Sequence, residues 1–314
     1  MATATVTERK GRYDDLKLSA RVFLANKAAV AGLIIFLLFV GDAVIVQVAP
    51  GLLGIQNPDV PFAEDFTITH PECIGQVPEA PSAQHILGTM QFGLGGIGCI
   101  DLLQFIMKAI RVDVALSFFI VLLGAAIGSV VGVMSGYAGG LVDEAMMRVT
   151  DIFFTIPYLI LALAVGYTIG RTLLNMALAL VVVWWPLYAR YTRSLTLSTK
   201  EATFVEAARA SGSGTGKVMF KHILPNVLPP VFVQISLDVG TVILVFATLA
   251  FIGFLPSDSF VPELGYIANQ GLDLAQLGYW WTVIMPGLAI TLFSLAVNLM
   301  GDGFRDVIDP RRRS

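Results

Sequence analysis

Long runs of apolar residues alternate with polar segments along most of the chain. A helix that crosses a membrane needs about 20 mostly apolar residues, and six runs come close to that length or exceed it. They cover residues 28–49, 114–137, 152–168, 173–188, 227–255 and 279–300. The third and fourth runs are short, but Gly170 and Arg171 supply a polar turn between them. The pattern therefore predicts an all-α integral membrane protein with about six transmembrane helices.

Composition supports the same class of protein. Hydrophobic residues make up 56% of the chain and charged residues 14%, whereas a soluble domain carries about 25% charged residues. The formal net charge of −3 argues against nucleic acid as a partner. The first apolar run is too long for the core of a signal peptide, so we expect it to be retained as a helix.

Basic residues collect on one side of the predicted membrane. With six crossings, every lysine and arginine except Lys108, Arg111 and Arg171 falls on the side that holds both termini. Cytoplasmic loops carry an excess of lysine and arginine. We therefore expect both termini to be cytoplasmic in a multi-pass protein of the cell membrane.

Polar segments between the apolar runs define the expected organisation. Residues 1–27 form a cytoplasmic arm whose end is amphipathic and suited to the membrane surface. Residues 28–49 form the first transmembrane helix, and residues 50–110 form an extracytoplasmic loop. Residues 111–302 hold helices two to six together with a cytoplasmic loop at 189–226, and residues 303–314 form a cytoplasmic tail.

The loop at 189–226 carries the most informative motif. Its key residues are Glu206-Ala207-Ala208, then Gly212, then His222-Ile223-Leu224-Pro225. The two alanines leave one helix face without bulk, and Gly212 allows a turn that a side chain would resist. Pro225 is expected to end a second short helix. A helical hairpin across the ends of membrane helices suits docking into a groove of another protein.

This loop resembles the EAA loop of type I ABC importer permeases. Other segments resemble the dipeptide/oligopeptide/nickel permease family, and in particular its C-type permease. They are His85-Ile86-Leu87-Gly88-Thr89, Gly136-Tyr137-Ala138-Gly139-Gly140 with Asp143, Met147, Arg148 and Asp151, Trp185 with Tyr188-Ala189-Arg190 and Arg193, His222 to Asn226, Phe251-Ile252-Gly253, Pro286-Gly287, and residues 301–310. Met90 and Phe246 depart from acidic residues usual in that family, which leaves the solute open.

The resemblance implies a type I ABC importer permease fold and a heteromeric assembly. A second homologous permease would complete the pore, two ATPase subunits would dock on the loop, and an extracytoplasmic solute-binding protein would deliver a peptide or similar polar solute. That solute is a dipeptide, an oligopeptide, a nickel chelate or an oligosaccharide. The implied ATPase-coupling residues are Glu206, Ala207, Ala208, Gly212, His222, Leu224 and Pro225.

ATP and magnesium would then bind to the partner ATPases, so we expect no cofactor in this chain and no enzymatic activity. Residues 211–218 read SGSGTGKV but lack the spacing of a phosphate-binding loop. Two other functions stay open. A stand-alone secondary transporter usually shows internal repeats with broken helices, and an intramembrane enzyme needs a catalytic pair within the membrane helices. Neither feature is evident in the sequence, and the three histidines have no metal-ligand spacing.

Two further predictions concern single residues. Asp238 lies about 16 Å along the fifth predicted helix, and acidic residues at that depth usually face protein or water. With Gln234 and Thr241 on the same side, Asp238 is predicted to lie on or beside the solute path, the alternative being a polar clamp to another helix. Cys73 and Cys99 both fall in the outer loop and are predicted to form a disulfide, the alternative being two free thiols.

Overall fold

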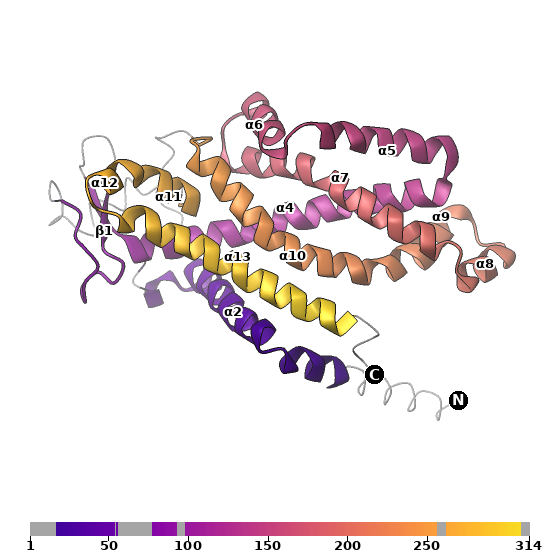
Figure 1. Ribbon diagram of the computed structural model, residues 1–314, viewed down its shortest axis with the longest axis horizontal. Coiled ribbons are helices and arrows are strands. Elements are labelled where there is room, and N and C mark those ends of the chain that lie inside the picture. The colour runs from indigo at the N-terminus through magenta and orange to yellow at the C-terminus, as the bar shows by residue number, and fades with distance from the viewer. Residues whose placement is uncertain (1–16, 54, 56–76, 93–97, 256–261, 309–314) are drawn as a thin grey trace.

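The computed structural model describes residues 17–53, 55, 77–92, 98–255 and 262–308, which form a bundle of long helices (Figure 1). The long helices are α2 (Lys27–Val48), α4 (Leu102–Ala138), α7 (Leu173–Thr199), α10 (Leu224–Phe251) and α13 (Trp281–Ile308). The shorter ones are η1 (Pro50–Leu53), α5 (Gly140–Thr155), α6 (Tyr158–Ile169), α8 (Thr203–Ala210), α9 (Thr215–Lys217), η3 (Val218–Ile223), α11 (Leu264–Gln270) and α12 (Leu272–Gln276). Strands β1 (Thr89–Phe92) and β2 (Gly98–Asp101) pair antiparallel.

Five helical segments are long and apolar enough to cross a membrane: α2, α4, α7, the continuous helix Thr215–Phe251, and α13. A sixth crossing exists if α5 and α6 are counted together, but these two helices meet at 94°. The third predicted run, 152–168, is therefore not one helix: it covers the end of α5 and most of α6. Pro157 accounts for the break, because the residue before a proline prefers extended backbone, and Ile156 has φ −98° and ψ 128°.

Helix also continues through Pro225, which was expected to end it. Pro225 lies at the start of α10, directly after helical residues 218–223, so the helix passes through this proline. The preceding turn η3 is π-helical and wider than an α-helical turn. The Asn226 amide Nδ2 donates to the carbonyl of His222 at 2.6 Å, so this carbonyl keeps a partner. The last part of the loop at 189–226 and the fifth crossing are one helix.

Helices α4 and α7 pack with their backbones in contact. Four glycines recur at every fourth position of α4 and so lie on one side of it: Gly124, Gly128, Gly132 and Gly136. A Cβ added to Gly128 would lie 2.5 Å from Cβ of Tyr188 and 2.8 Å from the backbone nitrogen of Ala189, with the Trp185 carbonyl closer still. Small residues at such an interface allow this approach. The stripe was not recognised in the sequence.

Both ends of the described chain lie at the same end of the bundle as α8 (Figure 1). There Asn26, the N-cap of α2, donates from Nδ2 to the Asp306 carboxylate near the end of α13 at 3.1 Å. The opposite end carries the β-hairpin, α11 and α12. Trp281 at the start of α13 connects this helix to the hairpin, because its Nε1 donates to the Thr89 carbonyl at 3.0 Å. The loop at 189–226 and the hairpin therefore lie at opposite ends.

Candidate functional site

The loop at 189–226 projects from the bundle as α8, α9 and η3 (Figure 1). Its first part is still α7, which continues to Thr199. Helix α8 is anchored by one side chain, Val205, which is fully buried. Val205 lies in a small apolar cluster whose other buried members are Val133, Val218, Ile223 and Val227. This cluster joins α8 to the end of α4 and the start of α10.

Gly212 forms the turn after α8, as the motif predicts. Its φ is +76°, in the left-handed region that favours glycine. The Gly212 N–H donates to the Arg209 carbonyl at 2.9 Å, and the Ser213 N–H donates to the Ala208 carbonyl at 3.1 Å. No heavy atom lies within 4 Å of a Cβ added at Gly212. A larger residue is thus disfavoured by backbone strain and not by a clash.

The predicted coupling residues divide into two groups. Glu206, Ala207 and Pro225 are exposed. Ala208, His222 and Leu224 are half-buried, and Leu224 packs on the valine cluster beneath α8. The exposed face of α8 and the turn after it are therefore accessible to a partner. The half-buried motif residues pack on the protein side of this face.

Two aromatic residues of this loop are exposed as well, and the sequence motif did not single them out. Phe204 is 42% exposed and Phe220 is 44% exposed. One helical turn after Glu206, the Arg209 guanidinium lies 5.0 Å from the ring centre of Tyr137 at the end of α4. Aromatic residues are enriched at protein interfaces, so the exposed rings make this loop suited to a protein partner. We call Phe204, Glu206, Ala207 and Phe220 the loop surface.

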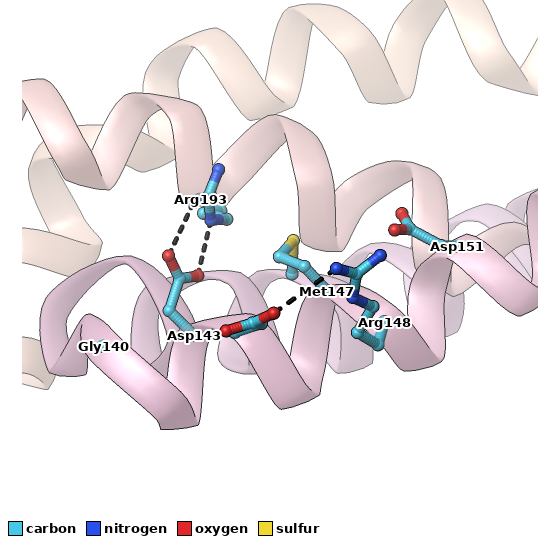
Figure 2. Close-up of a pocket in the computed structure, with 7 residues that line it drawn as sticks. Gly140, Asp143, Met147, Arg148, Asp151 and Arg193 are labelled. Atoms are coloured by element: carbon cyan, nitrogen blue, oxygen red, sulfur yellow. Dashed lines mark hydrogen bonds and ion pairs between the residues drawn. The ribbon is translucent and has the colours of Figure 1, made fainter.

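Ion pairs connect α5 with α7 next to this loop. Arg193 donates from Nε and from an Nη atom to the two Asp143 carboxylate oxygens, each at 2.6 Å (Figure 2). Asp143 also accepts from the Ser135 hydroxyl. A second pair joins Asp151 and Arg190. Both pairs link segments that the sequence motifs singled out separately, and the bidentate geometry makes the Asp143 pair the stronger one.

A groove of about 280 Å³ runs along α5 beside these pairs (Figure 2). Its lining consists of Gly140, Asp143, Glu144, Met147, Arg148, Asp151 and Arg193. Glu144 and Arg148 form an exposed pair one helical turn apart, at 3.4 Å. The groove thus offers both signs of charge to a polar group. In the part of the chain that the structure describes, no three His, Cys, Asp or Glu side chains are grouped as a metal site would need.

Asp238 is buried in the middle of α10, with 6% of its surface exposed. Gln234 donates from Nε2 to its Oδ1 at 3.0 Å. Trp184 and Tyr188 of α7 lie beside the carboxylate. Both side chains interact with Asp238, although Asp238 Oδ2, Trp184 Nε1 and Tyr188 Oη do not reach ordinary hydrogen-bond geometry within the described segments. Gln234 thus contacts Asp238 as predicted from their spacing, whereas the side chain of Thr241 is exposed.

The predicted disulfide cannot be placed, because Cys73 lies outside the described residues. Cys99 belongs to β2, where its backbone is opposite Gln91 of β1. His85 of the outer-loop motif has a structural role: its Nδ1 lies 2.9 Å from Asp101 Oδ2. Asp101 is the N-cap of α4 and accepts from the N–H groups of Leu103 and Gln104. The cysteine bridge stays a prediction.

Comparison with known proteins places this arrangement in a family. The family model described as "Binding-protein-dependent transport system inner membrane component" matches residues 128–314. The dipeptide transport system permease protein DppC of Alkalihalophilus pseudofirmus is 34% identical over 289 residues, which cover 92% of this chain and 88% of that protein. The di/tripeptide transport system permease protein DppC of Pseudomonas aeruginosa is 33% identical, covering 93% of this chain and 91% of that protein.

A third relative is the glutathione transport system permease protein GsiD of Pectobacterium atrosepticum, 35% identical over 75% of this chain and 76% of that protein. Among solved structures, an inward-facing form of the MetNI methionine ABC transporter superposes with a TM-score of 0.53 at 22% identity, covering 66% of this chain and 98% of that chain. This likeness shows the fold of an ABC importer transmembrane domain. The chain therefore belongs to the family of inner membrane components of binding-protein-dependent transport systems.

Proposed function

We propose that this chain is a permease subunit of an ABC importer and forms half of a translocation pore for a short peptide or a similar polar solute. Membership of the family supports transport that depends on a separate binding protein. It favours this function over a stand-alone secondary transporter and over an intramembrane enzyme. Three relatives are named for dipeptides, di- and tripeptides, and glutathione. Peptide-like solutes are therefore the preferred class.

The loop surface is the observation that carries the proposal of coupling to an ATPase. It presents Glu206 and two exposed aromatic rings at the end of the bundle. Beneath it, the valine cluster packs α8 against both α4 and α10. Protein cores are close-packed and transmit displacements between neighbouring elements. A partner that moves α8 therefore moves the ends of two membrane helices with it.

The assembly that follows contains a second homologous permease, two ATPase subunits and an extracytoplasmic solute-binding protein. ATP and magnesium belong to the ATPase subunits in this proposal. The distribution of lysine and arginine supports a cytoplasmic position for the loop and for both termini. The β-hairpin, at the opposite end of the bundle, then faces the binding protein.

Asp238 is our candidate for a contact with the solute. Trp184 and Tyr188 interact with its carboxylate, but these contacts do not reach ordinary hydrogen-bond geometry and leave the polar atoms of all three residues incompletely satisfied. Buried polar atoms without partners are costly unless water or another polar group completes them. A solute amine or amide that enters between α7 and α10 would supply the missing hydrogen-bond partners.

The coupling proposal is tested with two variants of the loop. Gly212→Val places a β-branched residue at a positive φ, which costs about 1–2 kcal/mol, and Glu206→Lys reverses the charge of the loop surface. Each variant is reconstituted with its partner subunits in proteoliposomes, and ATP-driven uptake and ATP hydrolysis are measured. We expect uptake to fall by roughly tenfold or more, with normal membrane insertion.

Glu201→Lys is the matched control, because Glu201 is an exposed acid of the same loop that precedes α8. It makes the same change of net charge away from the loop surface, and we expect it to retain uptake. Assembled complexes carrying Gly212→Val and Glu206→Lys that still couple hydrolysis to uptake would refute the proposed role of the loop.

A further inference from the structure

Two acidic side chains meet in the interior at the end of the bundle opposite the loop surface. Asp113 of α4 and Glu263, the N-cap of α11, both have no exposed surface. The Leu264 N–H donates to Asp113 Oδ2 at 3.1 Å, and the Tyr266 N–H donates to Glu263 Oε2 at 2.6 Å. Helix α11 is therefore attached to α4 through the Asp113 carboxyl group.

Each of these carboxyl groups uses only one oxygen. Asp113 Oδ1 and Glu263 Oε1 are buried and have no hydrogen-bond partner among the described residues. The two groups are close enough to interact electrostatically. Two ionised carboxylates in such a place would repel each other, and each would lack the water that stabilises its charge.

The surrounding helices offer no compensating charge within the part of the chain that is described. On α4, Lys108 and Arg111 lie on other faces than Asp113, and both have interactions of their own. The remaining ionisable residues of the helices packed on α11 are Asp238 of α10, Asp273 of α12, and Asp302, Arg305 and Asp306 of α13. Asp273 is exposed, and the three residues of α13 lie at its far end.

We propose that Asp113 and Glu263 bind one buried proton between them, and that this proton holds α11 on α4. With one proton bound, the pair carries a single negative charge instead of two, so the two buried carboxyl groups no longer repel each other. The remaining negative charge is then shared by the N–H groups of Leu264 and Tyr266, which already donate to the pair.

The position of α11 makes this proton consequential. A Cβ added at Gly265 would run into the backbone of Ala247, so α11 lies directly on the backbone of α10. Asn269 donates from Nδ2 to the Phe251 carbonyl at 2.7 Å, and Thr282 of α13 donates its hydroxyl to the Gly271 carbonyl at 3.0 Å. Loss of the proton thus destabilises an element that contacts three membrane helices.

Burial raises the pKa of Glu263 from 4.5 to about 7, which gives the pH response its sign. A carboxyl group with a raised pKa stabilises the folded state most at low pH, and this stabilisation is lost as pH rises toward the folded-state pKa. We expect the attachment of α11 to weaken between about pH 5 and about pH 8.

Infrared spectroscopy of the full chain in its assembled complex tests for the proton directly. The carbonyl stretch of a protonated carboxyl group should be present in the parent at acidic pH and disappear as pH rises. It should be absent or much reduced in Asp113→Asn and in Glu263→Gln. An amide in either position carries no charge at any pH, so it removes the repulsion between the two carboxylates without the bound proton.

Hydrogen exchange of the α11 amides, corrected for the intrinsic effect of pH, tests the attachment. In the parent we expect protection to fall by roughly tenfold across the same pH range, and in Asp113→Asn and Glu263→Gln to stay nearly constant. Asp273→Asn, which neutralises an exposed acid of the neighbouring α12, should behave as the parent does.

Two results would overturn the proposal. One is a parent spectrum without a protonated carboxyl band, and this measurement needs no variant. The other is a fall in α11 protection with rising pH in Asp113→Asn or Glu263→Gln that equals the fall in the parent. None of these measurements depends on transport, so their outcome is separate from that of the proposed function.

Discussion

The same substitution, glycine to alanine, should have opposite effects on stability at two positions of the α4 glycine stripe that lie one turn apart. Gly128→Ala adds a methyl group 2.5 Å from Cβ of Tyr188 and 2.8 Å from the nitrogen of Ala189. Carbon atoms prefer separations of about 3.5–4.0 Å, so α7 has to move away by about 1 Å. At Gly124 the added methyl would lie 3.4 Å from its nearest neighbour, Cβ of Trp184, which is an ordinary contact.

The magnitudes follow from two opposing effects. Overpacking of a well-packed interface costs about 1–3 kcal/mol, while replacing a helical glycine by alanine gains about 0.5–1 kcal/mol. The net expectation for Gly128→Ala is a loss of about 1–2 kcal/mol, because the overpacking term dominates. For Gly124→Ala the helix term stands alone, and we expect a gain of about 0.5 kcal/mol.

Thermal unfolding of the two purified variants beside the parent measures this difference. At about 2–4 °C for each kcal/mol, Gly128→Ala should lower Tm by roughly 2–8 °C, and Gly124→Ala should raise it slightly. Because the two changes are chemically identical and lie on one helix face, each is the control for the other. If Gly128→Ala melts at or above the temperature of Gly124→Ala, the close approach of α4 and α7 is wrong.

Three further predictions concern individual contacts. Asp238→Asn should change the rate or selectivity of transport while the complex assembles normally; parental transport by Asp238→Asn, with an assembly defect only in Asp238→Leu, would mean a structural role. Arg193→Lys replaces two hydrogen bonds to Asp143 by one and should destabilise the chain by about 1 kcal/mol in denaturant unfolding, whereas Arg148→Lys at an exposed pair should have no measurable effect. Thiol labelling of the unreduced, denatured chain should find neither of its two cysteines free, and labelling of both would exclude the predicted disulfide.

Runs of apolar residues predicted most of the long helices, because membrane helices are much more apolar than the loops between them. They missed the bend between α5 and α6, since residues on both sides of the break are apolar. The available signal was Pro157, which restricts the residue before it to extended backbone. The opposite error occurred at Pro225, which was expected to end a helix that in fact continues through it.

The candidate site was only partly predictable for a similar reason. Gly212 could be assigned to a turn because its chemistry is local. The Asp143–Arg193 ion pair joins residues 50 positions apart, and the approach of Tyr188 to Asp238 depends on how α7 packs on α10. A single sequence reports none of these neighbours. Phe204 and Phe220 look like ordinary core residues until their exposure is known.

The continuity of helix from Thr215 to Phe251 has a mechanical consequence. This segment is 37 residues long, or about 55 Å at 1.5 Å per residue. It acts as a rod with one end under α8 and the other beside α11. A tilt of about 5° about one end displaces the other by roughly 5 Å, the rise of one helical turn. Its backbone hydrogen bonding departs from the α-helical pattern at the π-helical turn η3 and at the interior prolines Pro229 and Pro230. A displacement of α8 therefore either tilts the whole rod or is absorbed by bending within this segment.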